Sequence, residues 1–152
     1  MYENLIKEAE IENIEVVEIS FRSRDMKGLY LDNVIGLNKT MSVSEKACIL
    51  AEELGHYHTT YGNILDQTST INIKKEKLAR NWGYTRLVNF SLLIEAFELK
   101  IKGVYDLADF LEVTPSFLAE AIKHYHEKYG EYHKIGVYTL FFNPLGILKS
   151  FE

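Results

Sequence analysis

The sequence predicts an α+β fold in a single domain over residues 1–152, mainly helical and with a small antiparallel sheet near its start. Three observations support this prediction. The chain has 152 residues, 47% of them hydrophobic, which suits one core. Short β-branched segments precede residue 40, and apolar residues recur at helical spacing over much of the rest. No linker, repeat or low-complexity stretch separates these segments.

The first elements are a short helix and a group of strands. Apolar residues at helical spacing predict an amphipathic helix over residues 2–10. Three β-branched or apolar segments then read as strands, and Asp32-Asn33 supplies a turn between the last two. The expected strands are residues 14–19, 28–31 and 34–37. We expect them to form a small antiparallel sheet.

A well-marked helix follows the strands. Ser42 or Ser44 provides its N-cap, Glu45 lies in its first turn, and an apolar stripe runs from Val43 to Leu54. A polar stretch then continues to residue 70 and predicts a loop before the next helical pattern, which begins near Lys74.

The second half of the chain predicts further helices and a strand-like tail. One helix is expected over residues 90–101, with Gly103 just past its end. Residues 105–129 read as two helices, because Thr114 is suited to the N-cap and Pro115 to the first turn of the second one. Residues 137–142 resemble a strand, followed by a turn at 143–146.

Composition excludes several classes of protein. No apolar run is long enough to cross a membrane, and the first residues lack the features of a signal peptide, so we expect a cytoplasmic protein. The net charge of −5 argues against direct nucleic-acid binding. The helix pair around Thr114 resembles a helix-turn-helix, but the first basic residue of its second helix is Lys123, which favours packing or protein contact. The lone Cys48 has apolar neighbours and reads as a buried structural thiol.

Residues 51–56, Ala-Glu-Glu-Leu-Gly-His, carry the most specific chemical signal. In the His-Glu-x-x-His signature of zinc proteases, the outer residues share one helix face and bind the metal, while the inner glutamate polarises the attacking water. Here Glu52 takes the first ligand position, Glu53 the inner position and His56 the second ligand position. A third ligand must come from elsewhere, and Glu76 on the next helix is placed to reach back.

These residues, together with Gly62-Asn63-Ile64 and Glu76-x-x-Ala79-Arg80-x-Trp82-Gly83, resemble the ImmA/IrrE family of metallopeptidases, most clearly its phage and prophage members. The resemblance is strong over residues 28–88. It implies a zincin-like domain with a metal-site helix pair. It also implies that His56 and Glu76 are metal ligands and that Glu53 is the general base. Glu52 stands where the family has its first histidine.

The resemblance implies a metal-dependent endopeptidase that cuts a regulatory protein, such as a phage-type transcriptional repressor. Zinc is the expected metal, and manganese or iron are alternatives because a second carboxylate makes the ligand set of Glu52, His56 and Glu76 harder. Two alternatives stay open. Glu52 and Glu53 could form a solvated helix face, with His56 interacting with the helix dipole. The chain could also be a non-catalytic regulatory or interaction domain that keeps the fold and a metal.

The other histidines are not expected to bind the metal. His58 points about 200° away from His56 on a regular helix, which favours a surface or supporting role. The spacing of His124, His126 and His133 fits no common zinc pattern, so these are expected to be surface residues.

Overall fold

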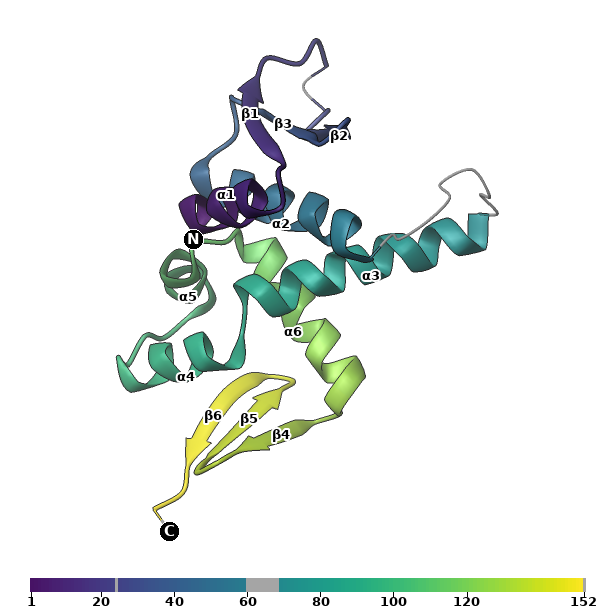
Figure 1. Cartoon of the computed structure of the whole chain (residues 1–152). Helices are drawn as coiled ribbons and strands as arrows, with labels where there is room; N and C mark the ends of the chain where they lie inside the picture. Colours follow the sequence, from purple (N-terminus) through teal and green to yellow (C-terminus); the bar gives the residue numbers. More distant parts are fainter. Residues whose placement is uncertain (24, 60–68, 152) are drawn as a thin grey trace.

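The computed structural model describes residues 1–23, 25–59 and 69–151, and for residues 69–71 it describes the backbone alone. Within these ranges the fold is α+β, as predicted, with helices between two three-stranded sheets (Figure 1). The helices are α1 (Tyr2–Ile11), α2 (Val43–Thr59), α3 (Ser69–Leu87), α4 (Phe90–Glu98), α5 (Val104–Leu111) and α6 (Pro115–Tyr129). The strands are β1 (Glu15–Ile19), β2 (Gly28–Leu31), β3 (Val34–Asn38), β4 (Tyr132–Ile135), β5 (Tyr138–Phe142) and β6 (Leu145–Lys149).

The first sheet has the order β1-β3-β2 and corrects the prediction of an antiparallel sheet. Strands β2 and β3 are antiparallel, but β1 runs parallel to β3, with Glu15 opposite Val34. Asp32 and Asn33 have φ angles of 49° and 62°, a left-handed conformation that these residue types tolerate and that two-residue hairpins require. The turn fixes the local hairpin, whereas β1 joins the opposite edge of β3.

The second sheet is antiparallel, with the order β4-β5-β6. Strand β5 confirms the predicted strand, and β6 is the apolar piece that follows the predicted turn. Strand β4 was not predicted, because it is short and lies between Gly130 and Gly136, both of which have positive φ angles. This sheet lies at the opposite end of the helices from the first sheet (Figure 1).

The helix boundaries follow their caps. The Ser42 hydroxyl accepts a hydrogen bond from Glu45 N at 3.2 Å, which selects Ser42 over Ser44 as the cap of α2. Thr114 Oγ1 accepts one from Phe117 N at 3.2 Å, confirming the predicted break between α5 and α6.

Two helix boundaries differ from the prediction. Helix α3 begins at Ser69 rather than near Lys74, and most of the loop predicted before it lies outside the described residues. Helix α4 ends at Glu98 rather than near residue 101, because Lys100 adopts a φ of 60°, which no α-helix continues through.

Helix α2 runs through the middle of the hydrophobic core. It packs against α3 on one side and beneath β3 on another, and its buried residues are Ala47, Cys48, Leu50, Ala51, Leu54 and Gly55. Burial of Cys48 agrees with the structural thiol expected from the sequence. Among the helices that the structure describes, none combines the length and apolar character needed to cross a bilayer.

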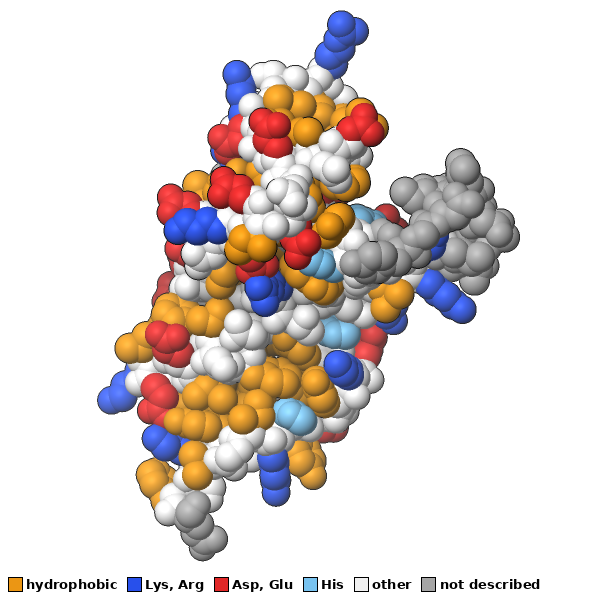
Figure 2. All heavy atoms as spheres, viewed as in Figure 1, with side chains coloured by type: hydrophobic (Ala, Val, Ile, Leu, Met, Phe, Trp, Pro, Cys, Tyr) orange, Lys and Arg blue, Asp and Glu red, His pale blue; other side chains and the backbone are white. Residues whose placement is uncertain are grey.

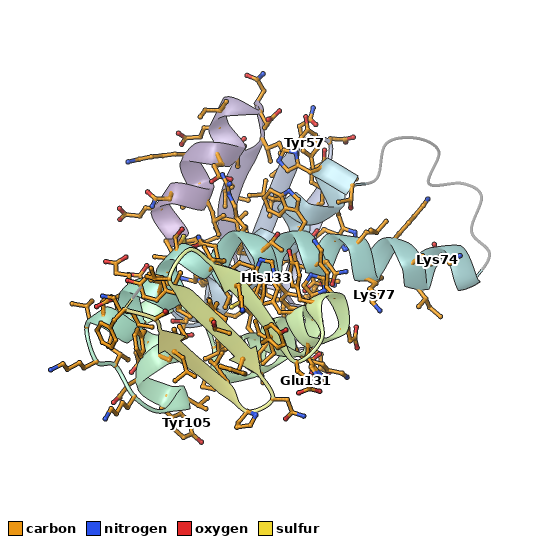
Figure 3. All side chains as sticks on the ribbon, turned by 90° about the horizontal axis from the view of Figure 1, so that it is seen from below. Tyr57, Lys74, Lys77, Tyr105, Glu131 and His133 are labelled. Carbon is orange, nitrogen blue, oxygen red and sulfur yellow. The ribbon has the colours of Figure 1, made fainter. Side chains whose placement is uncertain are left out.

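A second packed region joins α4, α6 and the second sheet. We call it the aromatic layer, formed by Phe90, Tyr125, Tyr129, His133 and Phe142, whose rings lie 4.4 to 6.3 Å from their neighbours. His133 is therefore half-buried among rings rather than a surface residue, and Figure 3 labels it where the sheet meets the helices. Hydrophobic side chains also gather on the outer surface of this end of the molecule (Figure 2).

Candidate metal centre

The close approach of α2 and α3 positions the candidate site. A side chain at Gly55 would place its Cβ only 2.2 Å from the carbonyl oxygen of Ala79, so the two backbones touch at this point. One turn further, a Cβ at Gly83 would meet Ala51 at 3.4 Å. Small residues at these crossings allow long polar side chains from the two helices to meet beside the contact.

The structure brings together the three residues predicted as metal ligands. Glu52 and His56 lie one turn apart on α2, and Glu76 reaches them from α3. One ligand atom from each lies within 4.8 Å of the others. His56 Nε2 is 3.3 Å from Glu76 Oε1. Two ligands of a tetrahedral ion, each about 2.1 Å from it, are about 3.4 Å apart, so this pair already has ligand spacing.

The donor set fits a divalent cation. It offers one imidazole nitrogen and two carboxylates, and each is an accepted ligand of zinc. All three ligand atoms lie within 4.8 Å of one another, so small side-chain rotations would bring them around a single ion. Glu52, Glu53 and His56 are each half-buried, which argues against the alternative that Glu52 and Glu53 form a simple solvated helix face.

Glu53 lies next to this group but outside it. Its carboxylate faces the start of β2, where a Cβ on Gly28 would be 3.6 Å from Glu53 Oε1. Burial raises the pKa of Glu53, the carboxylates of Glu52 and Glu76 raise it further, and His56 opposes them. A carboxylate with a raised pKa is a better proton acceptor near neutral pH, which suits the general-base role predicted from the sequence.

Arg80 also belongs to the site, although the sequence assigned it no role. It lies one turn after Glu76 on α3, and its Nε is 3.4 Å from Glu52 Oε1. Glu52 is the main cause of the raised pKa of the Arg80 guanidinium. The sequence held two signals: Arg80 is part of the motif around Glu76, and its spacing from Glu76 places both on one helix face.

Surface hollows lined by described residues adjoin the site, and three of them border its carboxylates. One of about 640 Å³ borders Glu52 between α2 and the start of α6. A second of about 590 Å³ borders Glu52 and Glu53 beside the start of β2. A third of about 510 Å³ borders Glu76 between α3 and α6. Arg80 lines all three, so its side chain stands where they meet.

His58 on α2 contacts α3 away from the ligand group. Its ring stacks on that of Trp82 in α3, with centroids 4.9 Å apart and planes inclined by 20°. This contact agrees with the supporting role expected from the helix geometry, and His58 is not part of the ligand group.

Comparison with known proteins gives one match. The family model of peptidase M78, described as the IrrE N-terminal-like domain, matches residues 9–123. The matched range contains the first sheet and the candidate metal centre, and it ends within α6. The Gly62-Asn63-Ile64 part of the sequence motif lies outside the described residues. No curated protein and no solved structure shows significant similarity to the chain.

Proposed function

Because this chain belongs to the peptidase M78 family, also called the ImmA/IrrE family, we propose that it is a metal-dependent endopeptidase. The observation that carries the proposal is the convergence of Glu52, His56 and Glu76, with Glu53 beside them. Metallopeptidases need such a set of ligands next to a carboxylate that can accept a proton.

The residues divide the work of peptide hydrolysis. Glu52, His56 and Glu76 would hold the ion, which when bound supplies Lewis acidity to the scissile carbonyl and to the attacking water. Glu53 accepts a proton from that water as its oxygen adds to the carbonyl carbon. The C–N bond then breaks, and Glu53 passes the proton to the leaving nitrogen.

Zinc is the proposed metal, with manganese or iron as alternatives. The two carboxylates favour harder ions more than a two-histidine site would, and they offset more of the ion's charge. A bound ion with this ligand set would supply less activation to the attacking water, and the raised pKa of Glu53 makes its carboxylate a better proton acceptor, which offsets part of the loss.

A phage-type transcriptional repressor is the proposed substrate, on the basis of the resemblance to phage and prophage members of the family. Cleavage of such a regulator would change the expression of the genes that it controls. The hollows beside Glu52 and Glu53 provide open surface on which a peptide segment can lie.

A second candidate is a non-catalytic regulatory domain that binds its partner without cutting it. The observation that favours it is Glu52, which replaces an imidazole ligand and is already paired with Arg80. The two candidates differ in their dependence on Glu53, which catalysis needs and partner binding does not.

Metal binding can be tested by calorimetry. We expect chelator-treated protein to bind one equivalent of zinc or manganese, and His56→Ala to abolish this binding. His126→Ala is the matched control, because His126 pairs with Glu131 outside the ligand group. Absence of saturable binding in the native chain would refute the metallopeptidase proposal.

Turnover needs a separate test with a repressor as substrate. Glu53→Gln should bind metal and repressor but leave the repressor intact, as shown by electrophoresis. If Glu53→Gln acts on the repressor's target genes as well as the native protein does, the non-catalytic candidate is the correct one.

A further inference from the structure

We propose that Arg80 competes with the divalent ion for Glu52 and thereby sets the metal affinity of the centre. The inference rests on the proposed function, because it assumes that Glu52 is a metal ligand. It goes further by assigning a role to a residue outside the ligand set.

The first argument is geometric. Arg80 Nε and Glu52 Oε1 are 3.4 Å apart, while an ion on the same carboxylate would be about 2.1 Å from its oxygen. The guanidinium and the ion would then be within about 6 Å of each other. A single and a double positive charge at this separation repel each other even when water screens them, so ion binding and the Arg80–Glu52 pair oppose each other.

The second argument is the charge of the site. Glu52 and Glu76 converge at the centre, Glu53 lies next to Glu52 in the chain, and positive charge nearby stabilises such a cluster of carboxylates. Arg80 is a cation in contact with this cluster, with its Nε 3.4 Å from Glu52 Oε1. Arg80 therefore supplies charge that a divalent ion would otherwise supply.

The third argument is freedom of movement. The Arg80 side chain is 56% exposed and lines each of the three hollows around the site. Its guanidinium can leave Glu52 without disturbing the core or opening a cavity. An exposed ion pair of this kind is weak, so the ion can displace Arg80 at a modest cost in affinity.

The fourth argument explains why the pair involves Glu52 in particular. A neutral imidazole at this position would offer Arg80 no negative charge, and the two residues would have no reason to pair. Competition by Arg80 is therefore a consequence of the glutamate in the first ligand position. It raises the metal concentration at which the site is half occupied.

The test compares metal affinities by calorimetry. Arg80→Gln removes the charge and should tighten manganese and zinc binding about tenfold, equivalent to about 1.4 kcal/mol. Arg80→Lys keeps the charge and should remain within about threefold of the native affinity. Position 80 is exposed, so both variants should have the same circular dichroism spectrum as the native protein. Equal or weaker binding by Arg80→Gln would overturn the proposal.

A second pair of variants tests whether the effect passes through Glu52. In a Glu52→His background, Arg80→Gln should change the affinity by less than about threefold, because Arg80 no longer has a carboxylate to hold. A full tenfold effect in that background would overturn competition for Glu52 and leave only general repulsion.

The design separates this inference from the proposed function. If His56→Ala abolishes binding while Arg80→Gln has native affinity, the metal centre stands and the role of Arg80 is wrong. If neither the native chain nor Arg80→Gln binds metal, both proposals fail.

Discussion

Between α2 and α3 the closest contacts are made by backbone atoms and by glycine and alanine, whereas between α4, α6 and the second sheet they are made by large rings. Gly55 and Ala79 touch through their backbones. In the aromatic layer, Phe142 lies against Phe90 with centroids 6.1 Å apart and also contacts Tyr125. The first contact brings polar groups together at the surface, and the second buries apolar area.

The difference shows that one region positions the candidate site, while the other mainly buries apolar surface that stabilises the fold. A metal centre built from two helices needs the helices close, because glutamate and histidine side chains have a limited reach, and small residues allow that close approach. The aromatic layer has no such constraint and contributes mainly buried area. It also lies largely beyond residue 123, where the family match ends. Substitutions in the two regions should therefore have different consequences.

The largest expected effect is that of Phe142→Ala. Phe142 is 4% exposed, and removing a buried ring costs about 3–5 kcal/mol of unfolding free energy. Urea unfolding followed by circular dichroism measures this loss. Metal affinity of the folded variant should be unchanged, and a weaker affinity would show that the aromatic layer also shapes the site.

Gly55→Ala should have a smaller effect on stability but a direct effect on the site. An alanine normally favours a helix, but here its Cβ would meet the Ala79 carbonyl oxygen, so α3 must move. We expect a loss of about 1–3 kcal/mol and weaker metal binding, because Glu76 moves with α3.

Gly146→Ala is the control for this substitution, since a Cβ there meets nothing within 4 Å. It should leave metal affinity unchanged and stability nearly so. Equal effects of the two substitutions would mean that the backbone contact of α2 and α3 is not what positions Glu76.

Tyr125→Phe should cost about 1 kcal/mol. The Tyr125 hydroxyl is buried and donates a hydrogen bond of 2.7 Å to the Val88 carbonyl oxygen, which joins α6 to the segment between α3 and α4. Urea unfolding measures the loss of unfolding free energy, and metal titration should show an unchanged affinity. No loss of stability would mean that another group satisfies the Val88 carbonyl oxygen.

The smallest expected effect concerns Cys48 on α2, which tests how closed the core is beneath the site. Burial raises the pKa of this thiol to about 11, so the thiol stays protonated at pH 8. The thiolate is the reactive form, and a disulfide reagent should therefore react slowly with native protein and rapidly in urea. Equally fast reaction in both conditions would show that α2 opens readily.

Local chemistry made much of the fold predictable. Thr114 and Pro115 mark the start of α6, and Asp32-Asn33 marks the hairpin, because each acts on its own stretch of backbone. The parallel pairing of β1 with β3 was not predictable in this way. It joins segments about 20 residues apart, and the strand pattern is the same for either direction of pairing.

The candidate site was predictable to a similar degree. Helix spacing placed Glu52 and His56 on one face, and the motif after the loop supplied Glu76, which the structure brings to the same point. The contact of Arg80 with Glu52 depends on how two helices cross, which no spacing within either helix encodes. Where a site depends on such a crossing, sequence patterns identify candidate ligands but not the side chains that contact them from the other helix.

The stacking of His58 on Trp82 gives the helix pair a built-in optical reporter. Trp82 is the only tryptophan in the chain, and its ring spans the contact between α2 and α3. Indole emission responds to its immediate surroundings, so any shift of α3 relative to α2 changes the fluorescence of the native protein. Movement of one helix against the other, including any that accompanies the proposed metal binding, can thus be followed in real time without attaching a dye.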